Sequence, residues 1–174
     1  STKDYNMPIV SGDIDFHLSG GAANSSADAA LGGAISTTEV GAGVHNLFDI
    51  IGSSEATAGA TEYRCFYVKN NHGSLTLQSA KIYISADSTG ADTDIAIALA
   101  GEGVNGTAET VANEGTAPTG ETFSTPTTEG GALTIGDIPA GQHQAIWVRR
   151  TVSAGASAAT GLSATFTVVG DTAA

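Results

Sequence analysis

The sequence has little of several residue types on which common classes of protein depend. Of its 174 residues, one is cysteine, four are proline and six are lysine or arginine. A single cysteine, Cys65, excludes an internal disulfide and any Cys-x-x-Cys metal or redox motif. The basic residues face 18 acidic ones, which gives a net charge of −12. Because proteins neutralise nucleic-acid phosphates with clustered Lys and Arg, this balance argues against nucleic acid and anionic membranes as partners.

Long apolar runs are also missing. No stretch approaches the ~20 apolar residues that a membrane-spanning helix needs. The first seven residues lack the apolar core of a secretory signal peptide. We therefore expect no membrane association and synthesis in a reducing compartment, where Cys65 behaves as a small, buried apolar residue.

Glycine is abundant instead, with 23 residues, and small residues separate many short apolar runs. Residues 12–19, 94–100 and 161–169 alternate between apolar and polar or small side chains, which is the pattern of strands with one buried face. No helix–strand alternation occurs. The sequence therefore predicts an all-β fold, an antiparallel β-sandwich with long Gly/Ala/Thr-rich loops. Its topology is either jelly-roll or immunoglobulin-like.

The predicted organisation is simple. Residues 1–11 are expected to form an N-terminal arm, and residues 12–170 a single domain. Within it, residues 101–131 predict a long acidic loop that is either mobile or docked on a partner. Residues 34–40 suggest a short strand. Residues 45–51 suggest one or two helical turns that cap the sandwich and end at Gly52.

The most strand-like stretch spans residues 61–85. Aromatic and β-branched residues dominate 61–69 and 74–85, and Asn-Asn-His-Gly at 70–73 suits a tight turn. This pattern predicts a β-hairpin. We expect its exposed faces to carry half of the basic residues of the chain, Arg64, Lys69 and Lys81.

Two groups of residues have side chains that could bind a cation. Asp13, Asp15 and His17 share one face of a predicted strand, but they spread over about 13 Å at a rise of ~3.3 Å per residue. They cannot share one ion, so a solvated face is predicted. A second group lies in a turn that lacks the residue order of an EF-hand, where a Ca²⁺ ion stays an open alternative to an Asp-rich turn. It consists of Asp87, Asp92 and Asp94.

Motifs that carry catalysis are scarce. Residues 101–106 match Gly-x-Gly-x-x-Gly, but no amphipathic helix follows to meet a pyrophosphate, so the glycines are interpreted as a loop. Gly-x-Ser-x-Gly and His-Glu-x-x-His do not occur. The sequence therefore predicts no catalytic, metal-binding or cofactor-binding residues, and a protein that is not an enzyme.

The candidate interface residues are aromatic or basic, the types most enriched at binding hot spots. They are Tyr63, Tyr67, Trp147, Arg149 and Arg150. The alternative interpretation places Trp147 in the core, with the two arginines paired to acidic residues of the loops. Arg149 and Arg150 point to opposite faces of a strand, so only one of them can share a side with Trp147.

Four segments give the chain a resemblance to known proteins: residues 18–24, 31–36, 62–70 and 146–155. In these segments it is similar to small structural proteins of tailed bacteriophages that are encoded near the major capsid protein. These include capsid cement or decoration proteins and some tail or fibre components. The resemblance spreads over most of the region between residues 18 and 155 and carries no catalytic residues.

The resemblance implies a virion protein that is assembled in the bacterial host cytoplasm. A cement protein stabilises the head by bridging capsomers, with the major capsid protein as partner and often as a homotrimer. The alternative is a tail, baseplate or fibre component with a receptor- or glycan-binding face. A secreted hydrolase or lectin-like binding module is a third class.

Overall fold

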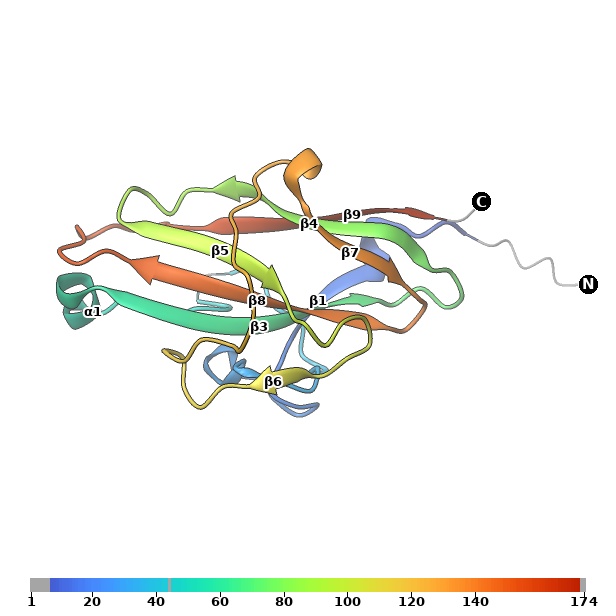
Figure 1. The fold of residues 1–174 in the computed structure, drawn as a ribbon, viewed down its shortest axis with the longest axis horizontal. Coiled ribbons are helices and arrows are strands. Elements are labelled where there is room, and N and C mark those ends of the chain that lie inside the picture. The colour runs from blue at the N-terminus through green and yellow to red at the C-terminus, as the bar shows by residue number, and fades with distance from the viewer. Residues whose placement is uncertain (1–6, 44, 173–174) are drawn as a thin grey trace, which may run out of the picture.

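The computed structural model describes residues 7–43 and 45–172, and antiparallel strands dominate it (Figure 1). The strands are β1 (Ile14–Leu18), β2 (Gly32–Gly33), β3 (Ala60–Asn70), β4 (Leu77–Asp87), β5 (Thr93–Leu99), β6 (Ala108–Thr110), β7 (Leu133–Ile138), β8 (His143–Val152) and β9 (Ala164–Thr172). The one α-helix in this part of the chain is α1 (Ser53–Ala58). Three short 3-10 turns complete the elements: Ser11–Asp13, Ala27–Ala29 and Glu129–Gly131.

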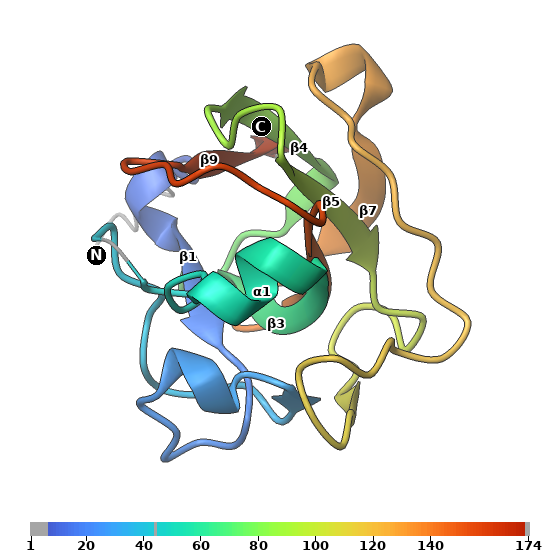
Figure 2. The ribbon, with the colours of Figure 1, turned by 90° about the vertical axis from the view of Figure 1, so that its left-hand side faces the viewer.

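The long strands form two sheets that pack face to face. A four-stranded sheet has the order β1-β3-β8-β5, and a three-stranded sheet has the order β7-β4-β9. The short strands β2 and β6 pair separately. Figure 2 looks onto the end of the sandwich that α1 covers. The predicted all-β sandwich is confirmed.

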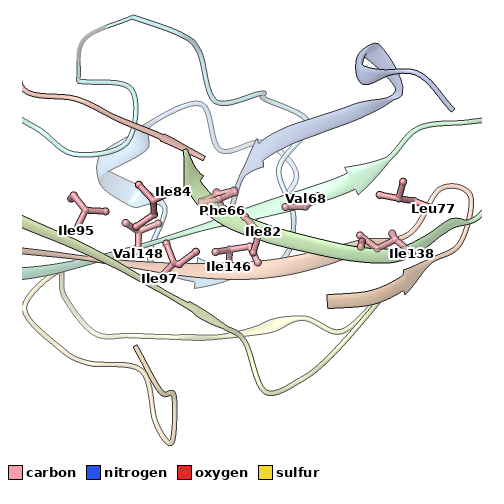
Figure 3. Packing of buried hydrophobic residues seen from close by; sticks show 11 residues of the cluster. Phe66, Val68, Leu77, Ile82, Ile84, Ile95, Ile97, Ile138, Ile146 and Val148 are labelled. Atoms are coloured by element: carbon pink, nitrogen blue, oxygen red, sulfur yellow. The ribbon is translucent and has the colours of Figure 1, made fainter. Parts of the chain in front are cut away.

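The core between the sheets follows from the alternation of side chains along each strand. Phe66, Val68, Ile146 and Val148 project from the four-stranded sheet, each at most 1% exposed. The ring of Phe66 stacks on that of Phe166 from the opposite sheet, with centroids 5.5 Å apart. Figure 3 shows the aliphatic side chains of both sheets meeting in this layer. Full burial of each such side chain stabilises the fold by about 1.5–3 kcal/mol.

A second apolar cluster covers the other face of the four-stranded sheet. Trp147 and Ala98 point outward from it and are 0% exposed, because Val111 and Phe123 of the 101–131 segment pack over them. Ser124 also exchanges two backbone hydrogen bonds with Ile97, at 2.8 and 3.0 Å. The prediction of a mobile loop is therefore wrong, since this segment packs on its own sheet.

The predicted hairpin of residues 61–85 is also wrong. Both strands exist as β3 and β4, but β3 pairs with β1 and β8 while β4 pairs with β7 and β9. The connection therefore crosses from one sheet to the other. The buried Asn70 amide holds it, donating to the carbonyls of Leu75 and Ile138 at 2.9 Å and accepting from the His72 amide at 3.0 Å. Both strands carry apolar side chains that pack into the same core from opposite sides. Two neighbouring strands of one sheet could not face each other across that core.

Smaller differences concern the flanking segments. Residues 34–40 run beside β1, with hydrogen bonds such as Val40 N to Phe16 O at 2.7 Å, but form only an isolated bridge instead of a strand. The helical turn lies after Gly52 as α1, whereas it was predicted before this glycine. The Glu55 carboxylate accepts from the Gly52 amide and fixes the start of α1. Residues 101–106 form turns, as the loop interpretation predicted.

The predicted N-terminal arm lies partly outside the described residues, which begin at Met7. The Met7 carbonyl accepts a hydrogen bond from the ring of His72 at 2.9 Å. That contact joins the chain before β1 to the β3–β4 connection.

Candidate functional site

The five predicted interface residues divide into a buried group and a partly exposed group. Tyr67 and Trp147 are 0% exposed and Arg150 is 7% exposed. The 101–131 segment covers the first two, so none of these three is available to a partner, and that part of the prediction is wrong. Tyr63 and Arg149 are partly exposed and stay candidates.

Tyr63 and Arg149 lie side by side on the outer face of the four-stranded sheet. They are directly paired in the register of β3 and β8. Phe123 lies against both: its ring centroid is 5.5 Å from that of Tyr63, edge to face, and 5.2 Å from the Arg149 guanidinium. We call these three residues the outer patch. It combines an aromatic surface with a positive charge, which suits contacts with carboxylates or with apolar rings.

A buried ionic cluster occupies one end of the sandwich. Arg150 donates to the Glu62 carboxylate, with Nε to Oε2 at 2.8 Å, and to the Asp49 carbonyl at 2.7 Å. Arg64 donates to Glu114 Oε2 at 2.7 Å. The alternative of arginines paired to acidic residues is confirmed for Arg150, which pairs with Asp49 of a loop as well as with Glu62. Arg64 is 0% exposed, so the prediction that it lies on an exposed face is wrong.

The cluster fastens irregular segments to the strands. Phe48 lies under both guanidinium groups, 5.4 Å from that of Arg64 and 4.8 Å from that of Arg150. Burial raises the pKa of Glu62, against the opposing hydrogen bond and charge of Arg150. Ligand oxygens of Asp49, Glu62 and Glu114 lie within 4.8 Å of one another, but the two arginines already bind these acids. The arrangement serves the fold.

A different group lies at the edge of the four-stranded sheet, where β1 meets residues 36–40. Asp15 and His17 lie on one face of β1, and Glu39 of the neighbouring segment forms an isolated backbone β-bridge with His17. Their ligand atoms lie within 4.8 Å of one another. His17 is 8% exposed, so the predicted solvated face is wrong for this residue. Asp13 has turned away, and its carboxylate accepts from the Val10 amide at 2.8 Å.

The sequence could not reveal this group, because its third member is 22 positions from His17 and comes from a segment without a clear pattern. The partial signal was Asp15 and His17 on one strand face.

The three aspartates of the 87–94 turn do not converge. Asp87 accepts from the backbone of Thr89 at 2.9 Å, and Asp92 accepts from that of Ser157 at 3.0 Å. Among the residues that the structure describes, neither group with metal-ligand spacing includes them. The Asp87 hydrogen bond is that of an Asp-rich turn, whereas the Asp92 bond joins this turn to the segment before β9.

Two buried titratable groups lie on the outer face of the four-stranded sheet, beneath the covering segments, and burial raises the pKa of both. Cys65 is a free thiol at 0% exposure, and burial raises its pKa, as expected for a small buried residue. Burial also raises the pKa of Tyr67 to about 12. The Tyr67 hydroxyl donates to Gly33 O at 2.7 Å and accepts from Ala108 N at 2.9 Å, so it ties the covering segments to β3.

Two shallow hollows mark the surface. One of about 160 Å³ lies beside Lys81 and Asp171. The other, of about 300 Å³, lies beside Glu39 and His45 and is at the lower limit for ligand pockets. Neither holds a hydrogen-bonded nucleophile–base pair among the described residues.

Comparison with protein families, with curated proteins and with solved structures finds no match to this chain. Within residues 7–43 and 45–172, no helix is long and apolar enough to cross a membrane.

Proposed function

We propose that the protein is a non-enzymatic structural component of a tailed-bacteriophage virion, a capsid cement or decoration protein that stabilises the head by bridging capsomers. The observation that carries the proposal is that buried charged and polar side chains hold the long loops in place. The buried ionic cluster and the hydroxyl of Tyr67 hold long loops on a β-sandwich. Such a body offers firm loop surfaces for contacts with neighbouring subunits.

Binding in this role comes from many modest contacts repeated over a lattice. The partner is the major capsid protein, and a homotrimer fits positions of local threefold symmetry. The outer patch supplies candidate contacts, because Tyr63, Phe123 and Arg149 are all partly exposed. The 101–131 segment that carries Phe123 is acidic, with Glu109 and Glu121 among its residues, and favours a partner surface with basic residues.

The test is co-sedimentation of the purified protein with emptied heads of the phage that encodes it, prepared without this protein. We expect saturable binding to the heads. The Arg149→Ala variant should bind more weakly, because arginine is among the residue types most enriched at the positions that dominate binding energy. Lys81→Ala is the matched control, since Lys81 lies on β4 of the opposite sheet. Wild-type protein that stays in the supernatant would contradict the proposal.

The outer patch also favours a second candidate, a tail, baseplate or fibre component with a glycan-binding face. Tyr63 and Phe123 present aromatic rings beside the Arg149 guanidinium, a combination that can stack on a sugar and bind its substituents. A positive glycan array that Tyr63→Ala abolishes, together with a low copy number per particle, would favour this candidate over the cement protein.

A further inference from the structure

We propose that Asp15, His17 and Glu39 form a binding site for a divalent transition-metal ion, with Zn²⁺ as the best fit. The site lies at the β1 edge and goes beyond the proposed function. It joins a strand to the irregular segment beside it.

The His17 ring is already prepared to act as a ligand. Its Nδ1 lies 2.9 Å from the carbonyl oxygen of Ser36, to which it can only donate. That hydrogen bond fixes the tautomer and leaves Nε2 with a free lone pair, the arrangement found around most metal-bound histidines. Nε2 is buried and has no hydrogen-bond partner. A buried acceptor without a partner destabilises the fold, and a bound cation would remove that cost.

Two carboxylates stand beside this ring. Ligand atoms of Asp15, His17 and Glu39 all lie within 4.8 Å of one another. No ion pair within 4.0 Å joins His17 to either carboxylate among the described residues. The three ligand atoms are therefore close together, while the His17 ring is not paired directly with either carboxylate. The backbone sets this placement, because Asp15 and His17 share a strand face and Glu39 pairs with His17.

The surroundings of the two carboxylates support the same interpretation. The side-chain amide of Asn71 donates to the Asp15 carboxylate and orients it. Glu39 is exposed and forms no hydrogen bond through its side chain in the described part of the chain, so it is free to turn inward. Tetrahedral zinc has bonds of about 2.0–2.2 Å, which puts its ligands roughly 3.4 Å apart. Closing the present spacing takes about one ångström of side-chain movement.

The ligand set selects among metals. One imidazole nitrogen and two carboxylates suit Zn²⁺ and similar first-row ions, with water in the remaining position. Ca²⁺ and Mg²⁺ prefer six or more oxygen ligands and gain little from an imidazole. A bound ion would clamp β1 to residues 36–40 and close this edge of the four-stranded sheet.

The test is calorimetric titration of the metal-free protein with Zn²⁺ alone, with thermal unfolding measured in parallel. We expect saturable binding of one ion per chain and a higher Tm at saturating Zn²⁺, because a ligand that binds only the folded state stabilises it. Mg²⁺ and Ca²⁺ at equal concentration should leave the Tm unchanged.

Variants locate the ion. Glu39→Gln, at an exposed position, should weaken binding by at least about tenfold without affecting folding. His17→Gln should abolish binding. Asp94→Asn removes an exposed carboxylate elsewhere and is the matched control, with wild-type affinity expected. The proposal is overturned if the wild type shows no saturable one-to-one binding, or if Glu39→Gln binds Zn²⁺ as tightly as the wild type does.

Discussion

At the scale of single residues, burial decides which side chains can act chemically. Cys65 lies on the outward face of β3 and would be open to reagents if that face met solvent. The covering segments reduce its exposure to 0% and raise its pKa. The thiolate is the nucleophile in thiol chemistry, so both effects protect it.

We therefore predict that Cys65 does not react with a thiol reagent such as Ellman's reagent in native buffer and reacts fully in denaturant. The labelling rate in dilute denaturant should follow the population of the unfolded chain. Ser85→Cys, at an exposed position of β4, should label at once in the folded protein. Stoichiometric labelling of native wild-type protein would show that the outer face is open.

His143 gives a pH-dependent prediction. Burial lowers its pKa, and the charge of Lys69 lowers it further. As the pH falls below 6.5, the ordinary value, the unfolded chain takes up a proton at this site before the folded chain does. Stability contributed by neutral His143 is therefore complete above pH 6.5 and is lost as the pH falls toward the lowered pKa.

The measurement is the free energy of unfolding by denaturant at several pH values between 7 and 5, for the wild type and His143→Gln. The variant should lose less stability over this range, because it has no proton to take up at position 143. The neutral Gln should cost the same stability at every pH, because it loses the edge contact of His143 with Tyr67, in which the two ring centroids are 4.8 Å apart. Equal pH slopes in the two proteins would contradict the assignment.

At the scale of elements, the ionic cluster helps to hold the irregular segments that carry Asp49 and Glu114 against the strands. The Glu62–Arg150 pair is almost fully buried, with side chains 4% and 8% exposed. Removing one partner from such a pair typically costs about 3–5 kcal/mol, because a buried charge is left uncompensated.

We predict a loss of this size for Arg150→Met, measured by chemical denaturation. The double variant Glu62→Leu/Arg150→Met should recover much of it, since neither charge then remains. Lys81→Met, at a partly exposed base, should change stability by no more than about 0.5 kcal/mol. Additive losses in the double variant would mean that the pair does not act as a unit.

Sequence patterns predicted the strands better than their partners. Period-two alternation marked β1, β5 and β9, because a half-buried strand leaves that trace in the sequence. The assignment of β3 and β4 to opposite sheets left no such trace. A short polar connection suits a hairpin and a crossover alike, and the buried Asn70 that fixes the crossover resembles an ordinary turn residue.

At the scale of the whole molecule, a second layer of packing was the feature that sequence reasoning missed. The 101–131 segment has few apolar residues, yet Val111 and Phe123 help to cover the outer face of the four-stranded sheet, together with Leu31 and Ile35. Small residues of β5 and β8, such as Ala98, allow this close approach. Three of the five candidate interface residues were assigned to the surface because nothing in their own strands shows the cover.

The charge distribution changes as well. Arg64 and Arg150 are enclosed by carboxylates, so the surface is poorer in positive charge than the composition suggests. Among the described residues, the partly exposed lysines and arginines are Lys69, Lys81 and Arg149 of the outer patch. A partner that binds the loops contacts acidic side chains. A partner that binds the outer patch contacts an arginine set among aromatic rings.

The most direct test of the proposed role is cryo-electron microscopy of the phage particle that carries this protein. The proposal predicts density for the β-sandwich on the outside of the head, repeated at symmetry-related positions across capsomer boundaries and arranged as trimers. Density confined to the tail, or heads that carry no copy of the sandwich, would contradict it.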